Sequence, residues 1–258
     1  MKKFQCIGIV AIMIFSFIYT EKIANLTLEK NEIYQDIENN SEYYNVSSVN
    51  ASIDENNIIP GLNGKKVNIK NSYFNMKDLN VFNSYYLKYE TTYPDVTIDN
   101  NKDKIVKQGN SLKNAVAFVF PYKEEFIDVF KSMDLDASVL VDMNTFKKDE
   151  KLEQINNEIE KYNNLESLLN KYKINSNICY LRNENEQICR NEKKYLVKTN
   201  NLVNNASFLQ IKNNIQSGNI YYLDEHLNVS NLKVLINSII YKDLDIVRLS
   251  KLLSEERD

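Results

Sequence analysis

The chain has 258 residues, enough for one barrel-sized domain or for one domain of ordinary size with additional segments. Hydrophobic residues make up 43% of it and charged residues 26%, a composition that can bury a substantial core. The formal net charge of -3 provides no basic field that could hold a phosphate backbone. Nucleic acid is therefore not expected as a partner.

The chain begins with an apolar segment. Lys2 and Lys3 precede an apolar run from Phe4 to Tyr19, the pattern of a secretory signal, and the run is near the lower length limit for crossing a bilayer. No small-residue cleavage site follows, so residues 1–20 are predicted to be an uncleaved membrane anchor. The predicted location is the cell membrane with an extracytoplasmic body, or secretion if the signal is cleaved.

Two segments of different character follow the anchor. Residues 21–57 are rich in Asn, Glu and Ser, which predicts a stalk or linker. In the next segment, "IIPGLNGKKVNIKNSYFNMK", the pairs Pro-Gly and Asn-Gly are turn signals, after which the pattern alternates and then becomes helical. With the extended segments behind it, this pattern predicts a small α+β module over residues 58–112.

Residues 113–258 carry an alternating strand and helix pattern. Short apolar runs typical of buried parallel strands lie at 115–120, 137–143, 176–181, 193–199, 219–223 and the start of 244–255. Between the second and third runs, apolar spacing predicts one long amphipathic helix that contains Leu152, Ile155, Ile159, Tyr162 and Leu169. The alternation predicts a parallel α/β barrel or open sheet.

Cys179 and Cys189 are the only cysteines outside the predicted anchor. An oxidising compartment permits a disulfide between them, and a strand end often packs closely on the helix that follows it. Two separate core thiols are the alternative. Two cysteines and a single histidine cannot supply the usual four ligands of a zinc site, so no metal cofactor is predicted.

Several segments together resemble the polysaccharide deacetylase family of carbohydrate esterases. They are "NAVAFVF" before a helix, "DASVLVD" after it, and the closing segment "GNIYYLDEHLNVSNLKVLINSIIYKDLDIVRLSKLLSE". The resemblance covers Asn114 to Glu255, and "IIPGLNGKKVNIKNSYFNMK" is similar to a segment found ahead of the catalytic domain in a divergent bacterial group of the family. The resemblance implies that residues 113–258 form the family's deformed (β/α) barrel, preceded by the small module and the anchor.

The chain departs from the family where the family's chemistry is carried. Family members typically have a Thr-Phe-Asp-Asp-Gly run at the end of the first strand, and here those places fall on Val119, Phe120, Pro121, Tyr122 and Lys123. The family's metal is also held by two histidines one helical turn apart, whereas this chain has one histidine in all. Without a metal ion nothing polarises an acetamide carbonyl or makes hydroxide at neutral pH. No catalytic and no metal-binding residues are therefore predicted.

The residues that remain at the predicted strand ends define a candidate ligand groove, formed by Phe120, Tyr122, Asp142, Tyr180, Asp224 and His226. The tyrosine rings could stack on sugars or pack in the core. Asp142 could carry a function or cap the next helix. The family's catalytic histidine falls on or beside Asp224, and His226 could be an acid or base or a surface residue.

The sequence thus predicts a catalytically inactive deacetylase-like protein that binds cell-wall glycan or a wall-associated protein. One alternative is an active polysaccharide or peptidoglycan N-deacetylase, or another hydrolase, that uses atypical residues such as Asp142 and Asp224. Another is a structural or assembly protein that keeps the fold as a partner surface. A metal analysis of the purified protein separates the enzyme, which would hold a catalytic metal, from the two other hypotheses.

Overall fold

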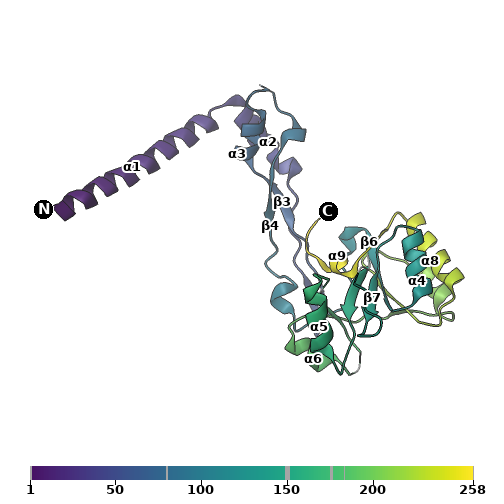
Figure 1. Cartoon of the computed structure of the whole chain (residues 1–258). Coiled ribbons are helices and arrows are strands. Elements are labelled where there is room, and N and C mark those ends of the chain that lie inside the picture. Colours follow the sequence, from purple (N-terminus) through teal and green to yellow (C-terminus); the bar gives the residue numbers. More distant parts are fainter. Residues whose placement is uncertain (1, 80, 149–151, 175–176, 183, 258) are drawn as a thin grey trace. The chain divides into compact units, whose positions relative to one another are not determined.

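The structure is a computed structural model that describes residues 2–79, 81–148, 152–174, 177–182 and 184–257, with side chains described from residue 12 onward except residue 24 (Figure 1). The chain forms two compact units. The first comprises Met1–Ser48 and Gly64–Thr92, and the second comprises Val49–Asn63 and Tyr93–Asp258.

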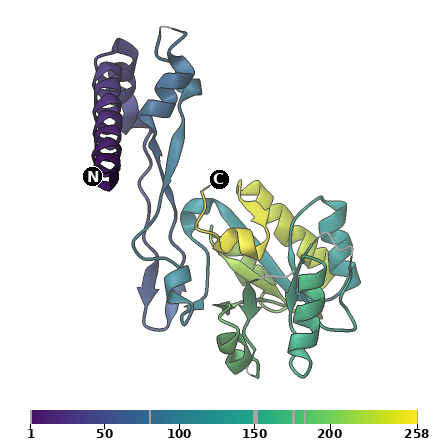
Figure 2. The same ribbon diagram turned by 60° about the vertical axis from the view of Figure 1, so that its left-hand side comes forward.

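The first unit is a small α+β body around an antiparallel strand pair (Figure 2). Its elements are α1 (Lys2–Glu29), α2 (Glu32–Tyr44), β3 (Gly64–Val67), α3 (Ile69–Met76), the 3-10 turn η1 (Ser84–Tyr86) and β4 (Tyr89–Thr92). The helix α2 begins where the Asn31 side chain accepts a hydrogen bond from the backbone of Ile33, the usual arrangement at a helix start. The buried core of this unit consists of Ile33, Ile37, Val67, Met76 and Leu87.

The predicted anchor falls on α1. Half of its apolar run lies at residues 2–11, whose side chains are outside the described residues. Within the described part of the chain, no helix combines the length and the apolar content that crossing a membrane requires.

The predicted boundaries of the stalk and the small module are wrong. Much of the predicted stalk, residues 21–57, is helical, because the buried side chains of α2 pack in the first unit's core. The predicted module, residues 58–112, is divided between the units, since β2 (Asn57–Ile59) pairs in parallel with β5 (Ile105–Val106) inside a sheet of the second unit. The turn signals were visible in the sequence, whereas this long-range pairing was not.

A six-stranded sheet forms the centre of the second unit. Its strands are β6 (Ala115–Pro121), β7 (Ser138–Val141), β8 (Glu153–Asn156), β11 (Asn201–Val203), β12 (Ile220–Leu223) and β13 (Asp245–Val247). The order is β11-β12-β6-β7-β8, with β13 also paired to β6, and every pair is parallel. The central strand β6 is buried from Ala115 to Phe120, as its unbroken apolar run predicts.

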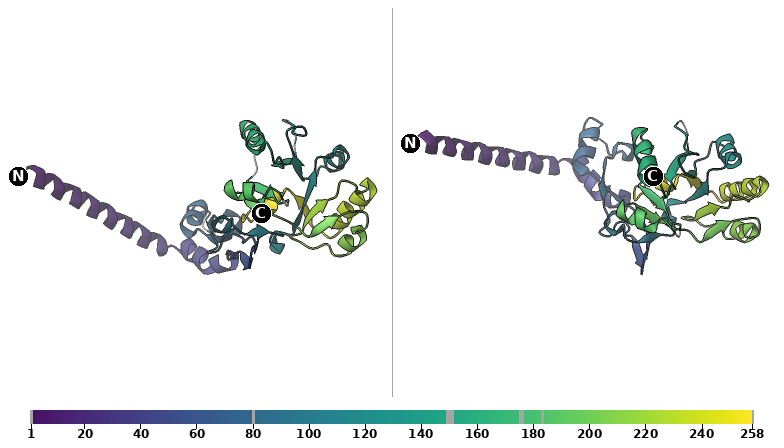
Figure 3. Two further views of the ribbon diagram at one scale, coloured as in Figure 1. Left: turned by 90° about the horizontal axis from the view of Figure 1, so that it is seen from below. Right: turned by 60° about the horizontal axis from the view of Figure 1, so that its bottom comes forward.

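Helices cover the outer face of this sheet. They include α4 (Glu124–Ser132), α7 (Phe208–Asn213) and α8 (Val229–Tyr241), which lie side by side (Figures 1 and 3). The buried residues of α4 and α8 recur every three to four positions, so each helix turns one apolar stripe to the sheet. The remaining helices are α5 (Tyr162–Lys171), α6 (Glu186–Asn191) and α9 (Leu249–Leu253).

The other strands form a separate five-stranded sheet. Its order is β1-β2-β5-β10-β9, where β1 is Ser52–Asp54, β9 is Ile178–Tyr180 and β10 is Tyr195–Val197. Only β1 and β2 pair antiparallel. The mixed α/β fold is as predicted, but the described strands of the second unit pair as two sheets and not as one closed barrel.

The prediction of one long helix that contains Leu152 and Leu169 is wrong for the first half of that segment. That half is the strand β8, and α5 begins only at Tyr162. Consecutive residues Gln154 and Ile155 are both buried, and the Gln154 side chain bonds the backbone N–H and C=O of Lys147. Because β8 is buried on both faces, the spacing of the apolar residues there also fitted a helix.

Candidate functional site

At the carboxyl end of β6, the residue just before the two aspartate positions of the family is part of the hydrophobic core. Phe120 has no exposed surface, and its ring stacks on Phe130 with centroids 5.4 Å apart and meets Phe126 edge-on at 5.7 Å. Tyr122 is half-buried and packs against the same core. Phe120 therefore cannot contact a ligand in a groove, contrary to the prediction.

Asp142 follows β7 and organises its own turn. Its Oδ1 accepts hydrogen bonds from the backbone N–H groups of Asn144 and Thr145 and from the Thr145 hydroxyl. Partial burial raises the pKa of Asp142, but these bonds to the ionised form outweigh burial and hold the pKa below its usual range. The carboxylate is committed to the turn, which accounts for the residue without a catalytic role.

Asp224 and His226 lie in the loop after β12. Asp224 Oδ1 accepts a hydrogen bond from the backbone N–H of His226, so the two residues are joined through the main chain. The imidazole is 85% exposed, and its Nε2 lies 3.4 Å from Glu225 Oε1. Lys123 donates a hydrogen bond to the Glu225 carbonyl, which brings the ends of β6 and β12 together. His226 is a surface residue in this arrangement.

Tyr180 and Tyr222 connect the ends of β9 and β12. Their rings stack with centroids 5.1 Å apart, and Tyr180 is only 8% exposed. Burial raises the pKa of both phenols, and the positive charge of Arg182 partly offsets this effect. Arg182 was not predicted, although it lies two residues beyond the β9 strand, where functional groups are common.

A disulfide fixes the segment that carries Arg182. Cys179 in β9 and Cys189 in α6 are bonded, with Cα atoms 5.9 Å apart, and both are fully buried. Between them, the Asn185 amide donates to the Tyr180 carbonyl and accepts from the Arg182 backbone N–H. The bridge joins α6 to β9, and the buried amide attaches the Arg182 backbone to the end of β9.

The residues at the strand ends do not fit the family's catalytic metal. Across the described residues, no group of three or more His, Cys, Asp or Glu side chains is placed to hold a metal ion. The end of β6 has Pro121 and Tyr122 in place of the family's carboxylates, and the Asp142 carboxylate is held by its own turn. This arrangement provides no protein-held Lewis acid for amide hydrolysis.

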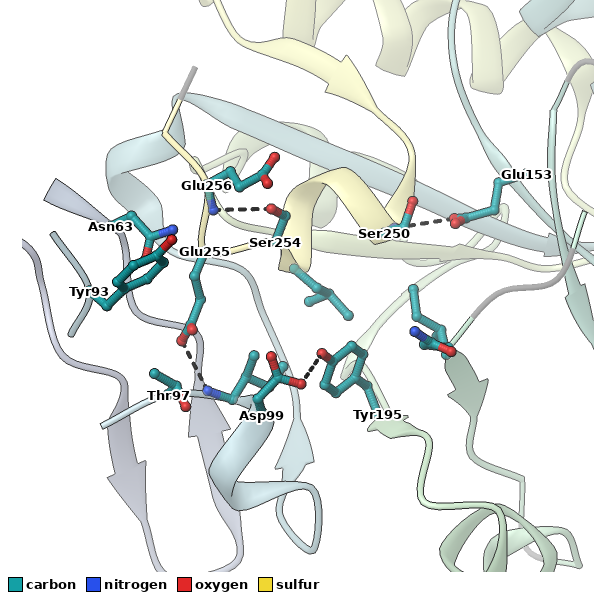
Figure 4. A pocket seen from close by; sticks show the side chains of 14 residues that line it. Asn63, Tyr93, Thr97, Asp99, Glu153, Tyr195, Ser250, Ser254, Glu255 and Glu256 are labelled. Carbon is teal, nitrogen blue, oxygen red and sulfur yellow. Dashed lines mark hydrogen bonds between the residues drawn. The ribbon is translucent and has the colours of Figure 1, made fainter. Parts of the chain in front are cut away.

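A cavity of about 530 Å³ lies at the opposite end of the strands (Figure 4). Glu153, Ile178 and Tyr195, which line it, are the first residues of β8, β9 and β10. Its other walls come from the segment around Asp99, from α9 and from the chain after α9. The lining residues are Asn63, Tyr93, Thr97, Ile98, Asp99, Glu153, Asn177, Ile178, Tyr195, Ser250, Leu253, Ser254, Glu255 and Glu256. None of the predicted groove residues lines this cavity.

The comparisons with known proteins place the fold. No family model matches the chain. The uncharacterized protein YlxY of Bacillus subtilis (strain 168) is 29% identical over 126 residues, which are 46% of this chain and 40% of YlxY. The match thus spans less than half of the length of that relative.

Solved structures extend the likeness to most of the chain. The wild-type BA3943, a CE4 family pseudoenzyme from Bacillus anthracis, has a TM-score of 0.62 at 16% identity, over 89% of this chain and 97% of that one. The chain has the fold of the CE4 polysaccharide deacetylases. A BA3943 mutant gives a TM-score of 0.64 at 16% identity over 89% of this chain and all of that one, and a BA3943 mutant with restored enzymatic activity gives 0.61 at 16% identity over 88% and 99%. The resemblance drawn from the sequence is confirmed at the level of the fold.

Proposed function

We propose that this chain is a catalytically inactive protein of the CE4 fold that binds N-acetylated cell-wall glycan. The observation that carries the proposal is the pair Pro121 and Tyr122 at the end of β6, where the family has its two aspartates and where neither side chain provides a carboxylate. A deacetylase needs a carboxylate base and a metal ligand at this place, whereas a binding protein needs neither. The likeness to a CE4 family pseudoenzyme supports the same reading.

The groups left near the strand ends suit binding better than hydrolysis. Tyr222 is half-buried near the charged Arg182, and Tyr122 is likewise half-buried, so each presents part of a ring to solvent. Partly exposed tyrosines and a planar guanidinium can contact sugar rings and acyl groups without any reacting group. The predicted groove is thereby reduced to its exposed members, since Phe120 and Tyr180 are buried.

We further propose that the protein acts outside the cytoplasm. The disulfide between Cys179 and Cys189 supports this location, because such bonds persist in oxidising compartments and are rare in the cytosol. Cell-wall glycan would be accessible there. A wall-associated protein is the other partner class that this location allows.

The alternative is an active deacetylase with unusual ligands. It would need Asp142 and Asp224 to hold a metal, yet the Asp142 Oδ1 already accepts hydrogen bonds from Asn144 and Thr145. Carboxylate-rich sites also favour hard cations such as Mg²⁺ or Ca²⁺ over zinc. These contacts favour the binding protein.

Metal content and acetate release separate the two functions. The full chain is dialysed, loaded with one equivalent of zinc, dialysed again and incubated with N-acetylated chitooligosaccharide. We expect no retained zinc, no acetate above the blank, and retention of the protein on an N-acetylated glycan resin. Retained zinc with acetate release that Asp224→Ala abolishes would instead establish the enzyme.

A further inference from the structure

The cavity at the amino ends of β8, β9 and β10 has the size and chemistry of a small-molecule site. Its volume of about 530 Å³ lies within the range of roughly 300–1,000 Å³ that is usual for such sites. The cavity lies at the opposite strand ends from the candidate ligand groove, because the strand residues that line it are the first of each strand and not the last. Its occupant can therefore be argued separately from the proposed glycan site.

The charge of the lining selects a positively charged group. Carboxylates line it at Asp99, Glu153, Glu255 and Glu256, and among the lining residues that the structure describes none is basic. A hydrogen bond from the Tyr195 hydroxyl, 2.6 Å long, lowers the pKa of Asp99, so this carboxylate is ionised at neutral pH. Since Lys102 pairs with Asp99, the negative charge that attracts a further cation comes mainly from Glu153, Glu255 and Glu256.

Two of the carboxylates are held in fixed positions. Glu153 Oε2 accepts hydrogen bonds from the Ser138 hydroxyl and the Ser250 backbone N–H. Glu255 Oε1 accepts from the backbone N–H groups of Gly61 and Ile98 (Figure 4). Because these contacts orient the carboxylates before any ligand arrives, binding does not have to order them.

The chain itself seats an ammonium group beside this cavity. Lys102 Nζ lies 3.3 Å from Asp99 Oδ1 and 4.8 Å from the centroid of the Tyr195 ring. Both Asp99 and Tyr195 line the cavity. A carboxylate next to an aromatic face is an arrangement that recognises alkylammonium groups, here with a cation from the protein.

The neutral part of the lining suits a ligand with several hydroxyl groups. Amide and hydroxyl side chains lie around the cavity, at Asn63, Thr97, Asn177, Ser250 and Ser254. Tyr93, also in the lining, is 73% exposed and offers most of its ring for contact. Polar side chains around an exposed aromatic ring fit the edges and face of a pyranose.

We propose that this cavity binds a small polyhydroxylated primary amine of the amino-sugar class, through its carboxylates for the ammonium group and through Tyr93 and the amide and hydroxyl side chains for the ring. The acetylated form of the same sugar has no ammonium group for the carboxylates. The cavity should therefore discriminate between the two forms. The proposal does not depend on the proposed function, whose ligand is N-acetylated and whose site lies at the other strand ends.

The test is isothermal titration of the full chain with a β-1,4-linked glucosamine disaccharide and with its di-N-acetylated counterpart. We expect saturable binding of the amine that depends on the cavity residues, whereas binding of the acetylated form, which belongs to the proposed glycan site, should not depend on them, since the charge-assisted contacts are lost. Glu256→Gln should weaken amine binding about threefold to fivefold, as one partly exposed ion pair contributes. Tyr93→Ala should weaken it by a similar factor.

Glu225→Gln is the matched control, because it neutralises an exposed carboxylate in the loop after β12 and should leave amine binding unchanged. Thermal unfolding midpoints within the error of the parent protein establish that each variant is folded. The proposal is overturned if the amine does not bind, if Glu256→Gln weakens the binding of both sugars equally, or if neither Glu256→Gln nor Tyr93→Ala weakens amine binding. Weakening by Glu225→Gln to the same extent would also overturn it, since attraction would then be non-specific.

Discussion

Replacing Phe120 tests whether the end of β6, next to the two former aspartate positions, is part of the core. Phe120 is fully buried and contacts Phe126 and Phe130 ring to ring. Truncating a buried phenylalanine costs about 3–5 kcal/mol, and each lost ring pair accounts for roughly 0.5–1.5 kcal/mol beyond buried area. We therefore expect Phe120→Ala to lower the free energy of unfolding by about 4 kcal/mol, near the middle of that range.

Urea unfolding followed by circular dichroism measures this change. Tyr241→Ala is the control, because its side chain is 92% exposed on α8 and its loss should change the free energy by no more than about 0.5 kcal/mol. A cost below about 1 kcal/mol for Phe120→Ala would refute the reasoning, since a residue that lines an open groove loses little on truncation. It would mean that the end of β6 is accessible to ligands.

Three further predictions concern the rest of the second unit. Reducing the disulfide, whose cysteines are 10 residues apart, should lower the free energy of unfolding by about 2.5–3 kcal/mol through the entropy of the unfolded chain, measured with and without reductant. Lys194→Met should lower the free energy of unfolding by about 3–5 kcal/mol, because it leaves the nearly buried Glu166 carboxylate without its ammonium partner. Arg190→Met, which breaks an exposed ion pair, should lower it by less than about 1 kcal/mol in the same assay. Tyr195→Phe should raise the pKa of Asp99 toward its usual value of 3.8, which carboxyl NMR titration measures. A lowered pKa in the folded state stabilises the protein above the unfolded pKa, and this stabilisation is lost as the pH falls through the folded pKa. The variant should therefore lose less stability in acid than the parent protein.

The parts of the fold that could be predicted are those whose information is local. The strand β6 and the helix α8 were predicted because an unbroken apolar run and a regular apolar spacing each fit one structure only. The strand β8 was not, since Ile155 and Leu152 also fit a helical spacing and the pairing with β7 that decides the matter is a contact between distant residues. The divided module failed for the same reason, as the pairing of β2 with β5 is invisible in either segment.

The same distinction applies to the candidate site. The loss of the aspartates could be read directly from Pro121 and Tyr122, but the burial of Phe120 beyond the reach of a ligand could not. Arg182 could have been found by asking which charged residue follows the β9 strand. The cavity could not, because residues such as Asn63, Glu153 and Glu256 come together only after the segment around Asp99 and the chain beyond α9 have packed at the strand starts.

The central claim is that the protein binds an N-acetylated glycan and leaves it intact. Native mass spectrometry of the full chain, supplied with zinc and incubated with an N-acetylglucosamine tetrasaccharide, tests both halves of the claim in one spectrum. We predict a one-to-one complex whose released ligand keeps the mass of every acetyl group after prolonged incubation. A ligand that has lost acetyl mass, or a spectrum without any complex at saturating tetrasaccharide, would contradict the account.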